Sequence, residues 1–419
     1  MTTTRHSHPS AYMYLVAPFG VVSGYLTVAL AFLLTKNGVS VEAVAALIAA
    51  SFVPNVWKFL WAPVVDTTLT SKTWYLIGAV MTSLGVWGMS ALPLTKANLP
   101  TITVIVVLAS IAATFVGMAT DSLMARATPE EEKGRAGGWF QAGNLGGGGI
   151  GGGLGLVMAQ KLAQPWMAGA LLAVLCALCA IPLLFVHEPP RVRPHGVAQS
   201  LRFVGRDLWQ LARARMGFVA LFLCFLPIGS GAASQLWSAV ADDWHASANA
   251  VALVTGVLGG VIMAVGSLAG GWLCDRMNRK GAYILYGLLQ AACAVAMAIF
   301  PHTERNYVVW TSVYAFITGL TYAGFTAFVL EAMGLGAAAT KYNLFASLSN
   351  FPIMYMTTYD GRAHTKWGAS GMLFTEAAVG LLGLVVFLLF LAAVKAWWPA
   401  RWGEHVGHSD LETSSTPAE

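Results

Sequence analysis

Long apolar runs limit what this chain can fold into more than any other feature. A helix that crosses a bilayer needs about 20 mostly apolar residues, and runs of this kind follow one another along the whole sequence. Only 10% of the residues are charged and 57% are hydrophobic, whereas soluble domains carry about 25% charged residues. Twelve runs are predicted, at about 12–34, 41–63, 73–94, 101–124, 137–160, 165–186, 214–239, 250–273, 281–300, 307–331, 340–359 and 368–396. The sequence therefore predicts an all-α membrane protein with twelve transmembrane helices.

The connections between runs are short, with one exception between the sixth and the seventh. This exception divides the chain into a six-helix bundle at 1–186, a linker at 187–213, a second six-helix bundle at 214–396 and a tail at 397–419. In the linker, apolar residues recur at helical spacing and arginines lie off that stripe. This pattern predicts an amphipathic helix on the membrane surface.

The distribution of basic residues predicts the orientation. Lys and Arg favour the cytoplasmic side of a membrane, and a cytoplasmic N-terminus places most of the 24 Lys and Arg residues on that side. Lys58 falls inside a run. The remainder fall on the other side, at Lys36, Lys96, Lys161, Arg305, Arg362 and Lys366. We expect a multi-pass protein of the cell inner membrane, with both termini in the cytoplasm.

The two halves of the chain show an internal repeat at a nearly constant offset. Pro18 and Gly20 in run one correspond to Pro227 and Gly229 in run seven. The same offset relates three further pairs, which are Asp66 with Asp275, Asp121 with Glu331, and Asn144 with Asn350 within a few residues. Two homologous six-helix halves around a shared central site are a recurring plan of secondary transporters. The repeat therefore favours transport by alternating access.

The loop after run eight carries the clearest motif. Residues 271–280 read GWLCDRMNRK, so an acidic residue at a helix end is followed by three basic residues. This stretch resembles the loop motif G-x-x-x-D-R-x-G-R-R/K of the major facilitator superfamily, with Asn278 in place of the usual glycine. Asn also tolerates left-handed backbone, so the departure is mild. The resemblance covers about the whole chain and implies two pseudo-symmetric six-helix bundles.

A narrower resemblance rests on the first five helices. The string KFLWAP at 58–63, closed by Asp66, is similar to the AmpG-type muropeptide permeases and their relatives, the acetyl-coenzyme A transporters and some siderophore permeases. Asp121 followed by Arg126, and the PEEEKG loop at 129–134, look similar to the same branch. This branch implies a medium-sized organic solute, taken up toward the cytoplasm and often with protons.

The candidate substrate-binding residues are polar or aromatic and lie at mid-depth. They are Tyr25, Asn55, Lys58, Gln141, Asn144, Gln235, Tyr322, Asn343 and Asn350. Each could instead make a hydrogen bond between helices. Lys58 has two further interpretations besides an anion contact: a partner for Asp121, or a side chain that snorkels to the cytoplasmic face.

The candidate gating or proton-coupling residues lie at helix ends. They are Asp66, Asp121, Asp275, Arg276, Arg279 and Glu331. A purely structural role beside basic loop residues is the alternative for Asp121 and Glu331. Glu376 lies in the outer part of run twelve, and peripheral helices of the fold that the resemblance implies seldom line the pathway. We therefore do not include Glu376 among the candidates.

Several classes of partner and cofactor are excluded by the sequence. The glycine run at 146–155 matches G-x-G-x-x-G, but no strand precedes it, so it does not predict a dinucleotide site. Glycines at this density let helices approach closely instead. We expect no cofactor, no metal and no nucleic acid, since no basic patch with interleaved aromatics lies outside the apolar runs. The expected partners are a small-molecule solute, H⁺ and the lipid bilayer, and we expect a monomer.

The sequence leaves three functions open. The first is a secondary active transporter for a muropeptide, siderophore or acyl-coenzyme A-like solute, with proton-coupled uptake. The second is a multidrug or metabolite exporter of the same fold. The third is a membrane enzyme or receptor, which is disfavoured because the chain has no H-E-x-x-H motif and no nucleophile elbow. We expect that the protein is not an enzyme.

Overall fold

The computed structural model describes residues 8–128, 133–188, 196–274, 276–333 and 344–397. These residues are largely helical, and no strand occurs among them. The first half contains α1 (Ala11–Gly24), η1 (Tyr25–Leu30), α2 (Ala31–Lys36), α3 (Val41–Thr67), α4 (Ser71–Ala91), α5 (Leu99–Ala127), α6 (Lys133–Gly149), η4 (Ile150–Leu154), α7 (Gly155–Lys161), α8 (Pro165–Leu178) and η5 (Ile181–Leu184). The helix α9 (Val197–Arg213) follows in the linker.

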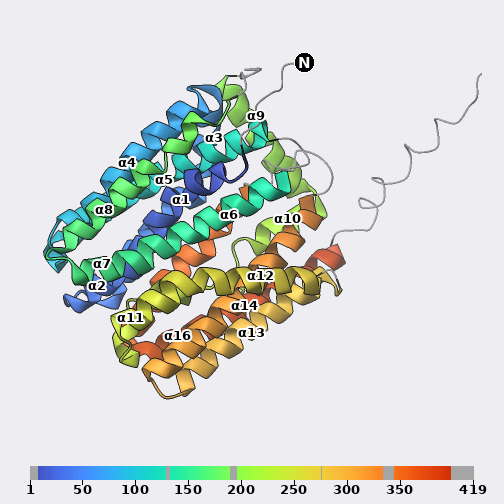
Figure 1. Ribbon diagram of the computed structural model, residues 1–419. Coiled ribbons are helices and arrows are strands. Elements are labelled where there is room, and N and C mark those ends of the chain that lie inside the picture. Colours follow the sequence, from blue (N-terminus) through green and yellow to red (C-terminus); the bar gives the residue numbers. More distant parts are fainter. Residues whose placement is uncertain (1–7, 129–132, 189–195, 275, 334–343, 398–419) are drawn as a thin grey trace, which may run out of the picture.

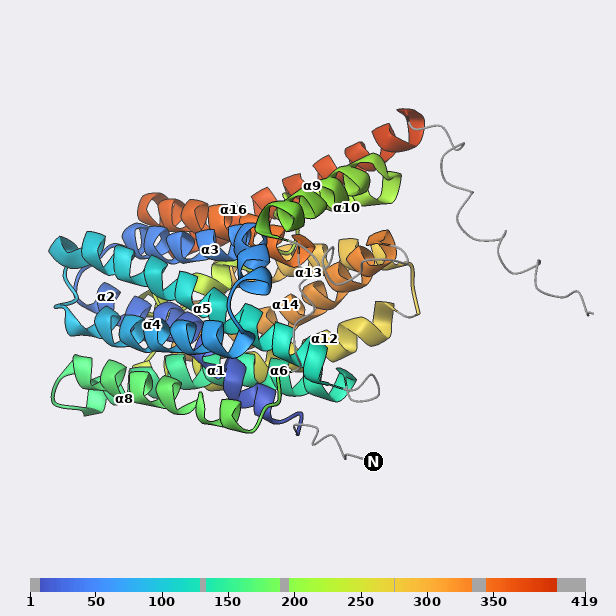
Figure 2. The ribbon, with the colours of Figure 1, turned by 90° about the horizontal axis from the view of Figure 1, so that it is seen from above.

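The second half begins with a short helix and a break. It contains α10 (Arg215–Leu223), η6 (Ala232–Leu236), η7 (Ala241–Trp244), α11 (Ala248–Val251), η8 (Ala252–Leu258), α12 (Gly259–Cys274), α13 (Arg279–Ile299), α14 (Glu304–Met333) and α16 (Asn350–Trp397). In Figure 1 the helices α1 to α8 lie together on one side and α10 to α16 on the other. Figure 2 shows α9 beside α10 and the end of α16.

The predicted runs match the observed helices closely. Eight helical stretches in the described residues are long and apolar enough to cross a membrane, and the last of them, 344–396, contains two runs. These two runs meet at Gly368, where φ is 69° and ψ is −170°. The predicted runs at 73–94, 137–160 and 214–239 correspond to α4, to α6 with its continuation α7, and to the broken segment that starts with α10. The fold class predicted from the sequence is confirmed.

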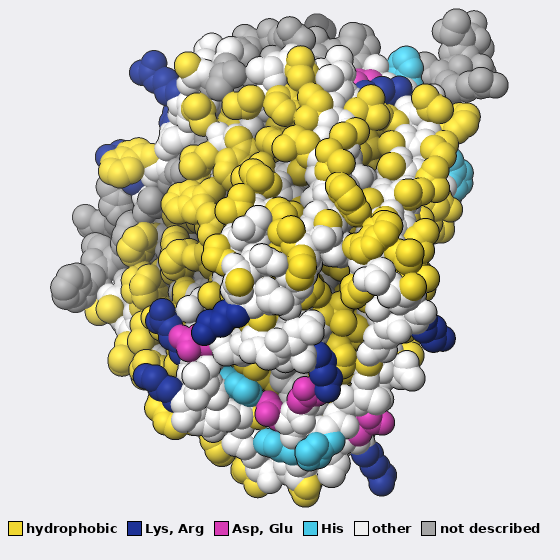
Figure 3. All heavy atoms as spheres, turned by 90° about the vertical axis from the view of Figure 1, so that its left-hand side faces the viewer, with side chains coloured by type: hydrophobic (Ala, Val, Ile, Leu, Met, Phe, Trp, Pro, Cys, Tyr) yellow, Lys and Arg dark blue, Asp and Glu magenta, His cyan; other side chains and the backbone are white. Residues whose placement is uncertain are grey.

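The outer surface is apolar, as contact with lipid requires. Leu268 and Leu184 are 76% and 79% exposed. In Figure 3 hydrophobic side chains cover most of the face in view, and charged and histidine side chains gather in its lower part. We call the end of the molecule that carries the start of α1 and α9 the linker end, and the end that carries α2 and α11 the far end (Figure 1).

Glycines bring α1 and α6 into backbone contact. A Cβ atom on Gly147 would lie 2.3 Å from the backbone oxygen of Ala17, and Gly143 and Gly151 approach α1 in the same way. A stripe of small residues at a spacing of four residues is a common way for helices to pack in lipid. The glycine run therefore packs helices, as the sequence predicted.

Three π-helical turns meet where the two halves touch. The turns η1, η4 and η8 contact one another, and a Cβ atom on Gly256 in η8 would lie 2.6 Å from the backbone of Gly153 in η4. Turns of this kind are rare and are frequent at functional sites. At this contact the halves approach through backbone atoms, because neither glycine carries a side chain.

The start of the linker is attached to the first half. Both carboxylate oxygens of Glu188 accept hydrogen bonds from backbone N–H groups at the start of α4, from Ser71 at 2.7 Å and from Lys72 at 3.2 Å. Arg126 at the end of α5 forms an ion pair with Glu188 at 3.5 Å. A carboxylate is favourable at a helix N-terminus, where unpaired N–H groups carry partial positive charge.

We predict that Gly147→Ala destabilises the protein, because the added methyl group meets the backbone of α1. The expected loss is about 1–3 kcal/mol of unfolding free energy, the usual cost of overpacking. Unfolding in mixed micelles measures it. The control is Gly146→Ala, the preceding residue, where a Cβ atom would meet nothing within 4 Å. Equal losses in the two variants would contradict the backbone-contact role.

Candidate functional site

A cavity of about 410 Å³ lies between the two halves. Its wall includes residues of α1, α3, α5 and α6 from the first half, and residues of η6, η8, α12, α14 and α16 from the second. The volume falls in the usual range for a small-molecule site, about 300–1,000 Å³. Six of the predicted binding residues line this cavity, namely Asn55, Lys58, Asn144, Gln235, Tyr322 and Asn350.

The other three predicted binding residues are placed differently. Tyr25 is fully buried in the apolar core and is not part of the cavity wall. Gln141 is exposed and lies outside the cavity wall as well. Asn343 lies outside the described residues. The periodicity of an apolar run gives the depth of a residue, but not the direction in which its side chain points.

Lys58 and Asp121 lie close enough to interact electrostatically across α3 and α5. Lys58 also lines the cavity, so its position is compatible both with an anion contact and with a partnership with Asp121. The two helices are joined nearby, because the indole Nε1 of Trp61 donates a hydrogen bond of 3.2 Å to the Thr114 hydroxyl. A carboxylate near a buried ammonium offsets part of its desolvation cost.

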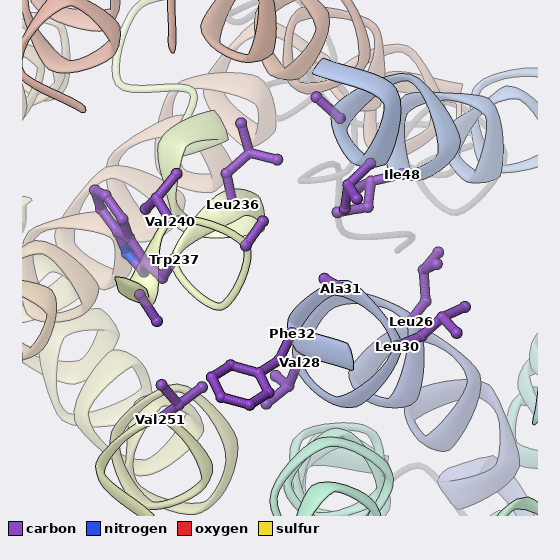
Figure 4. Packing of buried hydrophobic residues seen from close by; sticks show 14 of the residues in the cluster. Leu26, Val28, Leu30, Ala31, Phe32, Ile48, Leu236, Trp237, Val240 and Val251 are labelled. Carbon is purple, nitrogen blue, oxygen red and sulfur yellow. The ribbon is translucent and has the colours of Figure 1, made fainter. Parts of the chain in front are cut away.

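Apolar side chains from both halves pack together at the far end of the cavity. Figure 4 shows Phe32 of the first half beside Val251 of the second, with Leu26 and Ile48 on the opposite side of the view from Leu236. All five belong to one buried cluster.

Ion pairs lie on the same end of the molecule. Lys36 pairs with Asp242 at 2.5 Å, and Glu42 pairs with Arg362 at 3.7 Å. Each of these two pairs joins the first half to the second, whereas His364 and Asp243, which form a hydrogen bond of 2.7 Å, both lie within the second half. The side chains of the two joining pairs are largely exposed, so each of these pairs contributes little alone.

The predicted gating residues at the linker end are only partly described. Asp275 lies outside the described residues, and the side chains of Asp66 and Glu331 do too, although their backbones belong to the last turns of α3 and α14. Arg276 is exposed. Its guanidinium lies 3.7 Å from the centre of the Trp272 ring and donates a hydrogen bond to the Trp272 carbonyl.

The loop motif ends in a helix cap. Asn278 precedes α13 with φ −58° and ψ 124°, and its side-chain oxygen accepts hydrogen bonds from the N–H groups of Lys280 and Gly281. We considered the replacement of the motif's glycine by Asn278 mild because asparagine tolerates left-handed backbone, but Asn278 does not adopt that backbone, so this reason is wrong. Asn is one of the preferred N-cap residues, and it places Arg279 in the first turn of α13.

The seventh run is not one continuous helix. Between α10 and η6 the backbone turns at Gly229 and Gly231, with φ of 58° and 68°, a region that favours glycine. A Cβ atom on Gly229 would lie 2.5 Å from the side chain of Thr321. Discontinuous helices often form transporter sites near the middle of the bilayer.

Two buried carboxyl groups are absent from the candidates that the sequence supplied. Asp360 and Glu376 are 0% and 5% exposed and lie on the two arms of α16. The predicted run ended at residue 359 because residues 359–367, YDGRAHTKW, are too polar to favour a membrane helix, yet they are helical. The sequence did contain one indication of this pair, because Glu376 is an acidic residue inside an otherwise apolar run.

No group of three His, Cys, Asp or Glu side chains suited to a metal ion occurs in the part of the chain that the structure describes. The site chemistry is therefore that of hydrogen bonds, aromatic surfaces and a few charges.

Comparisons with known proteins agree with this architecture. The Major Facilitator Superfamily model matches residues 13–357. The anhydromuropeptide permease of Escherichia coli strain K12 is 24% identical over 357 residues, which cover 80% of this chain and 70% of the permease.

Several solved structures share the fold at low sequence identity. The nucleoside transporter NupG has a TM-score of 0.70 at 12% identity, with 91% of this chain and 98% of that chain covered. A POT peptide transporter in complex with sulfate has a TM-score of 0.69 at 10% identity, with 94% and 96% covered. The xylose transporter XylE from E. coli has a TM-score of 0.66 at 12% identity, with 92% and 98% covered. The family model spans more than half of the chain, and the chain belongs to the major facilitator superfamily.

Proposed function

We propose that this protein is a secondary active transporter that takes up a medium-sized organic solute across the inner membrane, coupled to protons. The observation that carries the proposal is a cavity lined by both halves, with buried apolar residues of both halves packed together at its far end. Such a site serves alternating access if the halves rock about it. We propose that the two six-helix bundles, 1–186 and 214–396, rock against each other as units. The linker 187–213 joins them, and 397–419 forms a tail.

We further propose that the linker end faces the cytoplasm, because the basic residues of the loops concentrate there. The apolar packing at the far end then closes the cavity to the periplasm. The structure would represent the state that exchanges solute with the cytoplasm.

We propose a muropeptide, siderophore or acyl-coenzyme A-like solute. The similarity to an anhydromuropeptide permease supports the first of these. Lys58 is the one charged side chain in the described cavity wall, and a cation in a polar and apolar wall suits a bulky solute with an anionic group.

Uptake into proteoliposomes tests this function. We expect a radiolabelled anhydromuropeptide to accumulate when the outside is made acidic, and we would compare a ferric siderophore and an acyl-coenzyme A. Efflux of drugs or metabolites without uptake would support the exporter instead, and drug sensitivity of a deletion strain would confirm that outcome. Chemical conversion of a probe without transport would support an enzyme.

We predict that Lys58→Met weakens transport of an anionic solute and spares a neutral analogue. Loss of a charged hydrogen bond of about 1.5–3 kcal/mol corresponds to a rise in KM of about 10-fold to 100-fold. The control is Lys161→Met, an exposed lysine at the end of α7 outside the cavity wall. Equal effects of Lys58→Met on both solutes would reject the counter-charge role.

We predict that Asp275→Asn impairs turnover but not insertion, since the loop motif would lose its acidic member. Initial uptake rates and the amount of protein in the membrane are measured together. Normal turnover of this variant would overturn the proposed gating role of Asp275.

We predict that Lys36→Glu opens the far end, because it replaces an ion pair between the halves with a repulsion. An exposed pair is worth about 0.2–1 kcal/mol, so a Ser234→Cys reporter in the cavity wall should react up to about fivefold faster with an impermeant maleimide added from outside. The double variant Lys36→Glu/Asp242→Lys should restore the slow rate. An unchanged rate in the single variant would show that the pair does not hold this end closed.

A further inference from the structure

We propose that the carboxyl groups of Asp360 and Glu376 share one bound proton, and that this is the proton that drives uptake. The second part rests on the proposed function, whereas the first part does not. Neither residue lies in the cavity wall or in the loop motif.

The two carboxyl groups face each other inside the second half. Asp360 lies on the first arm of α16 and Glu376 on the second, and the two side chains interact directly. Each lies eight residues from the turn at Gly368. At 1.5 Å per residue, each lies about 12 Å along its helical arm from that turn. Both are buried, at 0% and 5% exposure.

No cation compensates these carboxyl groups among the described residues. The nearest basic residues along the chain have other partners, since Arg362 pairs with Glu42 of α3 and His364 with Asp243. The other titratable groups that face the pair are neutral phenols, Tyr314 of α14 and Tyr355 of α16. The neighbouring helix α13 contributes the amide of Gln290, which approaches Tyr314.

Two adjacent carboxylates in such surroundings do not both ionise. Burial without a counter-charge disfavours the charged form, and a like charge nearby disfavours it further. The hydrogen bonds agree with this argument. Neither oxygen of Asp360 has a hydrogen-bond partner within the described chain, nor does Oε2 of Glu376. A proton between the two groups supplies the donor that these buried oxygens lack.

Glu376 also holds the broken segment of the seventh run. Its Oε1 accepts a hydrogen bond of 2.8 Å from the Tyr314 hydroxyl and one of 3.4 Å from the Ser230 hydroxyl. The backbone N–H of Ala233 in η6 donates to the same carboxyl group. Ser230 lies between the two glycines with positive φ, Gly229 and Gly231. The protonation state of Glu376 therefore acts directly on the turn.

The same groups reach the cavity wall. The ring of Tyr314 packs edge-on against Trp237, with 5.1 Å between the ring centres. Gln290 donates a hydrogen bond of 3.2 Å to the hydroxyl of Thr318. Trp237 and Thr318 both line the cavity. Loss of the proton creates a repulsion between the two carboxylates on the arms of α16, and it strengthens the hydrogen bonds that Glu376 accepts from the turn. The structure of the cavity wall therefore depends on whether the pair holds its proton.

Infrared difference spectroscopy tests the shared proton without any solute. The full chain in lipid nanodiscs should show the carbonyl stretch of a protonated carboxyl group at neutral pH. This band should move to the frequency of a single carboxyl group in Asp360→Asn and in Glu376→Gln, and it should not change in Glu304→Gln, which alters an exposed carboxylate outside the pair. No such band in the wild type, or a band that both variants leave unchanged, would overturn the proposal.

A second variant covers the case in which an amide substitution prevents folding. Tyr314→Phe removes one hydrogen-bond donor to Glu376 and keeps the ring against Trp237. The band should shift in frequency, because a hydrogen bond to the carboxyl group is lost. A band that does not move would exclude Glu376 as its source.

Proteoliposomes test the driving role, with radiolabelled anhydromuropeptide as the probe. Both amide variants should lose proton-driven accumulation by about tenfold or more, within the usual range of coupling between two sites, while solute counterflow continues. Accumulation that persists in both variants, or counterflow that is lost together with accumulation, would overturn the driving role.

The wild type separates this inference from the proposed function. Wild-type counterflow without proton-driven accumulation would refute proton coupling, and a wild type that moves no probe would refute the proposed function and the driving role with it. In both cases the infrared band still decides whether the pair binds a proton.

Discussion

Direct contact between helix backbones is the interaction on which this structure depends. In lipid, helices gain little from burying apolar side chains against one another, so they associate where small residues permit close packing. Gly147 on Ala17 and Gly256 on Gly153 are two such places. The first holds α1 against α6 within one half. The second joins the halves through π-helical turns, where Gly153 and Gly256 bring the two backbones together beside the cavity.

The sequence repeat does not produce identical structures in the two halves. Pro18 stays inside α1, and Gly20 packs against the backbone of α6 at Asn144. Their counterparts Pro227 and Gly229 lie in a break, where Gly229 adopts a positive φ. The first half thus uses its glycine for a close approach, and the second half uses it for a turn. A carboxyl group, that of Glu376, holds this turn through Ser230 and Ala233.

Much of the fold could be predicted from the sequence, because hydropathy and length determine which segments cross the bilayer. Part of the cavity wall could be predicted, since Asn55, Asn144 and Asn350, which were chosen by depth and by the repeat, all line the cavity. Tyr25 and Gln141 do not line it, because the direction in which a side chain points depends on packing between helices that are distant in the sequence. Asp360 was missed because its neighbours in the sequence are polar. Only its contact with the second carboxyl group, that of Glu376, marks it as a candidate site.

The attachment of Glu188 to the start of α4 distinguishes the two halves, because it fixes the start of the linker to the first half. The start of the linker is held on the first half by two backbone hydrogen bonds and by the ion pair with Arg126. If the halves rock as proposed, the linker moves with the first half up to Glu188. A deletion after Glu188 would then limit the movement between the halves, whereas a deletion before Glu188 would not change the length of linker that joins them.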